Sequence, residues 1–88
     1  KIVDDKEVKN LVMTEYPCVK EMHKIRSRGT KNNVFMDMHI QVDPKMTVEE
    51  SHRLMHNIER TIQKNIEENA HVIIHIEPYF YNKKDGTV

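Results

Sequence analysis

The stretch His71-Val72-Ile73-Ile74-His75-Ile76-Glu77-Pro78 decides the fold, because it reads as a β-strand with two chemically different faces. Side chains alternate between the faces of a strand. One face therefore carries Val72, Ile74 and Ile76, and the other carries His71, Ile73, His75 and Glu77. An imidazole and a carboxylate two residues apart, about 7 Å between Cα atoms, can converge on one divalent ion. A solvated sheet face would look similar, but Lys, Thr and Glu are more usual there than His.

A second strand is predicted over residues 34–42, where the alternation is the most regular in the chain. Its apolar row is Val34, Met36, Met38, Ile40 and Val42, and its polar row is Asp37, His39 and Gln41. Asp43-Pro44 ends it. Two strands that each present histidine on the face away from the core indicate a metal site between elements.

The remaining segments complete an α-β-β-α-β order. A cap at Asp4 predicts a first helix that ends at or before Tyr16, and residues 18–28 predict a strand. That strand alternates poorly, because Glu21 falls in the same row as Val19, His23 and Ile25. A turn at 29–33 joins it to the next strand, and the capping box Thr47-Val48-Glu49-Glu50 opens a helix running to about residue 69. We expect an α+β sandwich with both helices on one face of a three-stranded sheet and the histidine face left open.

Length and composition narrow the possible functions. The 88 residues predict a single domain, 1–88, with a frayed tail at about 79–88. The 14 basic residues balance the 14 acidic ones, so no nucleic-acid partner is expected. One cysteine cannot form an internal disulfide, and no apolar stretch approaches the ~20 residues that span a bilayer, so no membrane insertion of this segment is expected. A chain beginning at Lys1 indicates a fragment of a longer protein.

Six histidines in 88 residues are the one compositional excess, and they point to metal or pH chemistry. Imidazole and carboxylate are ligands that Zn²⁺ and its first-row neighbours accept. Five such groups fall on neighbouring predicted elements: His23, His39, His52, His75 and Glu77. Two further histidines are additional candidates. His56 pairs with His52 at i, i+4 but points about 40° further toward solvent on a helical wheel, and His71 lies at a strand entrance.

The sequence also resembles a known family. The segment Pro17-Cys18-Val19-Lys20-Glu21-Met22-His23-Lys24-Ile25-Arg26-Ser27-Arg28 is similar to the P-x-V-x-x-x-H-x-[IL]-R-x-R signature in the cytoplasmic C-terminal domain of cation diffusion facilitator transporters. The resemblance continues through residues 38–43, 46–52 and 75–78 in the family's order and spacing. It implies an αββαβ, ferredoxin-like fold resembling a metallochaperone, although the M-x-C-x-x-C loop of copper carriers is absent.

The resemblance implies a function as well. Such a domain dimerises on the cytoplasmic side of the cell membrane, below the transmembrane domain of the same polypeptide, which exchanges divalent cations for protons. In zinc-transporting members a paired metal site lies near the dimer contact. By position the implied ligands are His23, His39, His52 and His75, with Glu77 bridging or completing the site.

We therefore expect a homodimeric module, not an enzyme, that binds Zn²⁺ or another divalent cation such as Fe²⁺, Co²⁺ or Mn²⁺ and biases an attached efflux transporter. Two alternatives stay open. The domain could be a metal-free dimerisation scaffold whose histidines are solvated. It could also be a mononuclear metalloenzyme, because His39, His75 and Glu77 could form a two-histidine, one-carboxylate triad.

Overall fold

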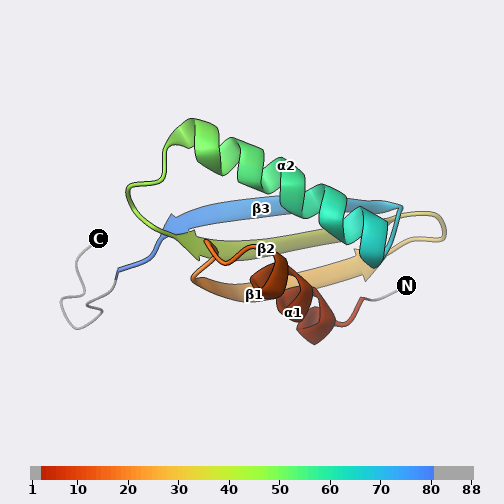
Figure 1. The fold of residues 1–88 in the computed structure, drawn as a ribbon. Helices are drawn as coiled ribbons and strands as arrows, with labels where there is room; N and C mark the ends of the chain where they lie inside the picture. Colours follow the sequence, from red (N-terminus) through yellow and green to blue (C-terminus); the bar gives the residue numbers. More distant parts are fainter. Residues whose placement is uncertain (1–2, 81–88) are drawn as a thin grey trace.

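A computed structural model describes residues 3–80, and these form two helices and three strands. In chain order the elements are α1 (Asp5–Glu15), β1 (Glu21–Gly29), β2 (Val34–Val42), α2 (Val48–Asn65) and β3 (Ala70–Pro78). The sheet has the order β1-β2-β3, and both helices pack on one of its faces (Figure 1). The predicted αββαβ arrangement is confirmed. Of the predicted tail, residues 81–88 lie outside the described part of the chain.

The helices begin at side-chain caps that the sequence indicated. The Thr47 hydroxyl accepts a hydrogen bond from the Glu50 backbone N–H, and the Glu50 carboxylate accepts one from the Thr47 N–H, which completes the predicted capping box. Helix α2 ends at Asn65, four residues earlier than predicted. The Asn65 side chain donates to the Thr61 carbonyl, and the N–H groups of Ile66 and Glu67 both turn back to one carbonyl, that of Ile62. The bond from Glu67 spans five residues instead of four, so the regular helical pattern ends at this point.

The core lies between the central strand and the two helices. The five side chains in the apolar row of β2 are at most 3% exposed, and they pack against Val8 and Val12 of α1 and Leu54, Ile58 and Ile62 of α2. Strand β1 pairs antiparallel to β2 through the predicted turn, whereas β3 pairs parallel to β2 after the α2 crossover. The apolar row of β3 is only half-buried because β3 is an edge strand. Within residues 3–80, no helix covers the opposite face of the sheet, which is the open, histidine-bearing face predicted above.

A β-bulge in β1 corrects one detail of the prediction. His23 pairs with His39 and Arg26 pairs with Asp37, so Lys24 and Ile25 together lie opposite the single residue between those two on β2. Lys24 adopts a positive φ of 54°. The extra residue reverses the alternation, so Ile25 packs against the core although His23, two residues earlier, points to the open face. His23 and Ile25 therefore do not share one row.

Candidate metal centre

Three histidines form a row across the open face of the sheet. His23 on β1 is the register partner of His39 on β2, and His39 is in turn the partner of His75 on β3. The ring centroids of His23 and His39 are 5.6 Å apart, and those of His39 and His75 are 4.6 Å apart, with nearly parallel rings in both pairs. The sheet register thus brings together residues that are far apart in the sequence.

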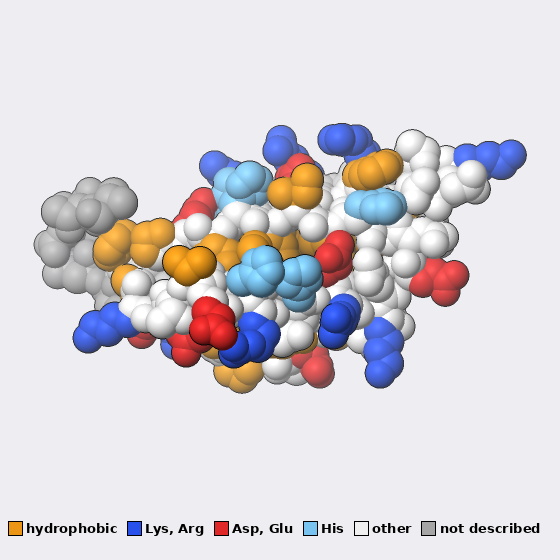
Figure 2. All heavy atoms as spheres, turned by 90° about the horizontal axis from the view of Figure 1, so that it is seen from above, with side chains coloured by type: hydrophobic (Ala, Val, Ile, Leu, Met, Phe, Trp, Pro, Cys, Tyr) orange, Lys and Arg blue, Asp and Glu red, His pale blue; other side chains and the backbone are white. Residues whose placement is uncertain are grey.

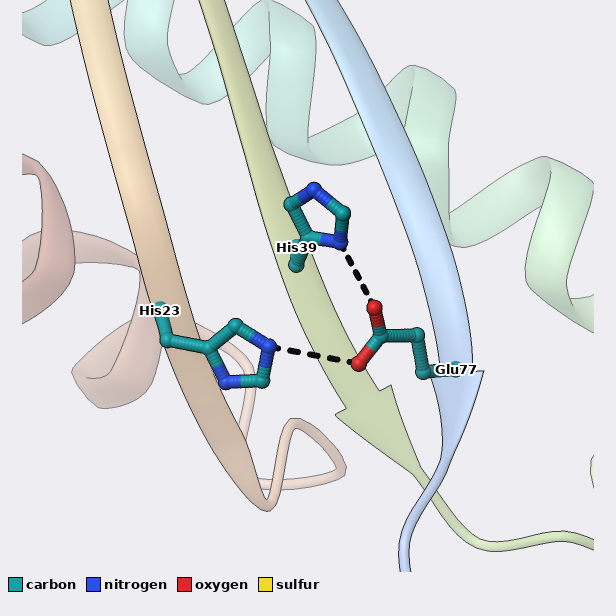
Figure 3. Close-up of side chains that lie close together, drawn as sticks. All are labelled: His23, His39 and Glu77. Carbon is teal, nitrogen blue, oxygen red and sulfur yellow. Dashed lines mark hydrogen bonds and ion pairs between the residues drawn. The ribbon is translucent and has the colours of Figure 1, made fainter. Parts of the chain in front are cut away.

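Glu77 lies two residues beyond His75 on the same face of β3, and it contacts two of these histidines. Its carboxylate oxygen Oε2 lies 2.6 Å from Nδ1 of His39, which donates a hydrogen bond to it. The other oxygen, Oε1, lies 3.2 Å from Nε2 of His23 and 3.4 Å from the amide nitrogen of Gln41. Figure 3 shows the two imidazoles, from β1 and β2, pointing toward opposite oxygens of the one carboxylate. We call His23, His39 and Glu77 the strand cluster.

The strand cluster favours a charged carboxylate. The hydrogen bond from His39 lowers the pKa of Glu77 below its ordinary value, with further lowering by the Gln41 hydrogen bond and the charges of His23 and His39, against the opposing effect of burial. The three side chains are between 21% and 39% exposed. Partial burial therefore orients them without removing their access to solvent and ions.

The donor set fits a divalent cation. Two imidazole nitrogens and a carboxylate oxygen, one from each strand, all lie within 4.8 Å of one another. Donors of a tetrahedral zinc ion are about 3.4 Å apart, so small rotations of half-exposed side chains suffice. The Glu77 oxygen accepts a hydrogen bond from Nδ1 of His39, so a cation that binds at that nitrogen replaces this hydrogen bond.

The other candidate residues on the sheet lie near the cluster or apart from it. His75 is exposed and lies within the histidine row, but its ring stacks on His39 and its nitrogens are not among the three grouped donors. His71 is the register partner of Phe35 and lies on the same face, four residues before His75. Its ring stacks on Phe35, and its Nε2 lies 2.9 Å from the Asn33 side-chain oxygen. The structure thus brings His75 to the cluster's edge and separates His71 from it.

His52 and His56 lie on α2, on the other side of the sheet from the strand cluster, and within one chain they do not join it. Both are exposed and contact each other, with 3.1 Å between their Nε2 atoms. Figure 2 shows histidine side chains at separate places on the surface seen from above, with hydrophobic side chains between them. The predicted ligand set is therefore divided into two groups in a single chain.

Two residues that support the site were not assigned that role from the sequence. The sequence placed Gln41 in the polar row of its strand. The parallel pairing of β2 with β3 puts Gln41 opposite Glu77, and its amide donates a hydrogen bond to the Glu77 carboxylate. Lys24 forms the bulge that leaves His23 on the open face. The poor alternation of residues 18–28 was the signal, because a bulge shifts the period of two by one residue.

Comparisons with known proteins show which family this chain belongs to. The sequence profile of the family described as "cation efflux protein, cytoplasmic domain" matches residues 3–79. The chain therefore belongs to this family, and the resemblance to cation diffusion facilitators is confirmed. Among residues 3–80, neither helix is long and apolar enough to cross a membrane.

Related transporters and solved domains agree with this assignment. The chain is 37% identical over 62 residues to "Metal tolerance protein C1" of Arabidopsis thaliana, covering 70% of this chain and 13% of that protein. It is 26% identical over 82 residues to "Manganese efflux system protein MneP" of Bacillus subtilis, covering 91% of this chain and 28% of that protein. The chain thus spans a small part of these relatives.

Solved structures share the ferredoxin-like fold. The metal-bound C-terminal domain of the CzcD transporter from Thermotoga maritima is 31% identical, with a TM-score of 0.74 over 83% of this chain and 85% of that one. A cytosolic domain of a cation diffusion facilitator family protein is also 31% identical, with a TM-score of 0.73 over 84% of this chain and 87% of that one.

Proposed function

We propose that this chain is the regulatory, dimerising domain of a divalent cation efflux transporter, and that it binds a zinc-type cation at the strand cluster. One observation carries the proposal: three donors of the kind zinc prefers, each from a different strand, converge within 4.8 Å on the open sheet face. His75 stands beside them and supplies a fourth ligand after a ring rotation. Such a site links all three strands and is formed only by the folded chain.

Dimerisation provides a way to pass metal binding to a transporter. A symmetric pair would bring two copies of the open face or its rim together. A bound cation favours whichever arrangement gives it more ligands, and only such differential binding can shift a conformational equilibrium. His52, which is remote from the strand cluster of its own chain, becomes available to the cluster of a partner. The membrane domain of the same polypeptide would sense the resulting movement.

The alternatives make different predictions. A metal-free scaffold needs no cation at the cluster, and its Glu77 would act only as a hydrogen-bond acceptor between strands. A mononuclear enzyme needs an enclosed site with an open coordination position. The cluster residues are partly exposed on an open sheet face, which favours a binding module over a catalyst.

Calorimetric titration with Zn²⁺ tests the binding step. We expect heat of binding at tens of micromolar zinc or below, and a loss of at least about tenfold in affinity for His39→Gln, which removes the central imidazole. His71→Gln is the matched control, because it removes a histidine from the same face but outside the cluster. Binding that is absent in the wild type, or equally weakened by both substitutions, would favour the scaffold.

The single cysteine allows the dimer to be tested without adding a label site. Cys18 is exposed and lies before β1, so a spin label there reports the separation of the two protomers. We expect zinc to shorten or narrow the distance distribution between labels. An unchanged distribution at saturating zinc would leave a metal-binding dimer without a switch.

A further inference from the structure

A second group of histidines lies on helix α2. His52 and His56 are four residues apart, which places them one above the other on one helix face. Their Nε2 atoms are 3.1 Å apart, and their ring planes meet at 69° with centroids 4.6 Å apart. Both side chains are exposed, on the side of α2 away from the buried residues Leu54, Ile58 and Ile62. Core packing therefore does not account for the pair, and the face toward solvent is open to a ligand.

The two Nε2 atoms are within hydrogen-bond distance of each other, so a cation that binds both rings must replace that hydrogen bond. Metal–nitrogen bonds of about 2.1 Å hold ligand nitrogens about 3.0–3.4 Å apart, so these two exposed rings reach one ion by small rotations. Imidazole is a ligand that Ni²⁺, Cu²⁺ and Zn²⁺ all accept.

We propose that His52 and His56 form a second metal site, on α2, for a divalent ion that takes imidazole ligands, such as Ni²⁺ or Cu²⁺. Both imidazoles bind through Nε2, and water completes the coordination on the exposed side. This proposal does not need a cation at the strand cluster, but it competes with the suggestion that His52 reaches the cluster of a partner, because one imidazole nitrogen cannot bind both ions. It gives the domain two sites that differ in ligand number.

The charges around the pair permit a cation. Arg53 follows His52 directly, but its guanidinium lies 3.3 Å from the Glu49 carboxylate on the preceding turn, which compensates its charge. Glu59, one turn beyond His56, accepts a hydrogen bond from the Val72 N–H and adds a negative charge beside β3. With two protein ligands against three, the helix pair should bind more weakly than the strand cluster and fill second.

The experiment titrates Ni²⁺ into the full chain carrying His23→Gln, His39→Gln and Glu77→Gln, which removes the strand cluster. We expect one remaining nickel site. Adding His56→Gln should weaken it at least about tenfold, because the second imidazole no longer binds intramolecularly. Adding His71→Gln should leave it unchanged.

The spacing itself has a matched control. His56→Gln combined with Asn57→His keeps the number of histidines but moves one to i, i+5, around the helix from His52, at an exposed position. This variant should bind nickel as weakly as His56→Gln alone. Equal affinity in the original and shifted arrangements would overturn the proposal.

A measurement on the unmodified chain keeps the test independent of whether the variants fold. In a zinc-saturated sample, added Ni²⁺ should broaden the imidazole NMR signals of His52 and His56 together, before those of His71. Broadening of His71 first, or of His52 without His56, would show that the helix pair is not a chelate.

Discussion

Glu77→Gln is expected to abolish most of the stabilisation that zinc gives this domain, with a modest cost when no metal is present. The substitution keeps the size of the side chain but removes the charge that His39 and His23 share. A hydrogen bond to a charged group contributes about 1.5–3 kcal/mol when buried. Glu77 is 34% exposed, so solvent screening reduces this to about 1 kcal/mol. The metal-free melting temperature should therefore fall by about 4–8 °C for a domain of this size.

The effect with zinc is larger. At a free zinc concentration of 100 times the wild-type dissociation constant, binding adds about 2.7 kcal/mol to the free energy of unfolding, or on the order of 10–20 °C. If losing the carboxylate weakens binding about 100-fold, the same zinc concentration stabilises the variant by only about 0.4 kcal/mol. The variant should thus show almost no zinc-induced rise in melting temperature.

Thermal unfolding followed by circular dichroism, with and without zinc, gives both numbers in one experiment. Glu21→Gln is the control, because Glu21 is a β1 residue two positions before His23 and loses the same charge without belonging to the strand cluster. It should keep most of the zinc-induced rise. An equal rise in the wild type and in Glu77→Gln would refute the assignment of Glu77 as a ligand.

Three further outcomes follow from the structure. Lys24→Gly should raise the free energy of unfolding by up to about 1 kcal/mol, because glycine adopts the positive φ of this position without a Cβ clash. Lys24→Val should lower the free energy of unfolding for the opposite reason, and denaturant unfolding measures both changes. Thr47→Ala should cost about 1 kcal/mol by the same assay, because α2 loses its capping box. The pKa values of Glu50 and Glu77 are both lowered in the folded state. The stability that these carboxylates contribute is therefore complete above about pH 4.5 and is lost as the pH falls through their folded pKa values. Urea unfolding across about pH 3–6 should show this decline, and a flat profile would contradict it.

The fold was largely predictable because β2 and the start of α2 carry strong local signals. The apolar row of β2 repeats every second residue, and all five of its members are buried. The capping box at Thr47 set the start of α2 to the residue. The end of α2 was not predictable to the residue, because the competition of the Asn65 amide for a helix carbonyl leaves no distinct pattern in the sequence.

The membership of the site was harder to predict because it depends on register between strands. Alternation alone put His39, His75 and Glu77 on the open face, as observed. It could not decide which of them meet. The observed pairing makes His39 the central ring and directs Glu77 toward His39 and His23. His52 was assigned to the same site because its helix neighbours the strands and because of the family resemblance. Its distance from the strand cluster within one chain follows from α2 lying on the other face.

The register of β3 against β2 therefore determines both the burial of the core and the geometry of the strand cluster. A slip of β3 by one residue against β2 would turn His75 and Glu77 toward the helices and expose the apolar row that faces them. A slip by two residues would keep the faces but would move Glu77 away from Gln41 and change its position relative to both imidazoles. Because Met38 and Ile40 of β2 are fully buried beside the apolar row of β3, the packing that stabilises the domain also fixes which donors converge. A variant that loosens this packing should weaken metal binding although it changes no ligand. Saturating zinc should restore the native register of such a variant, because zinc binds only the folded arrangement.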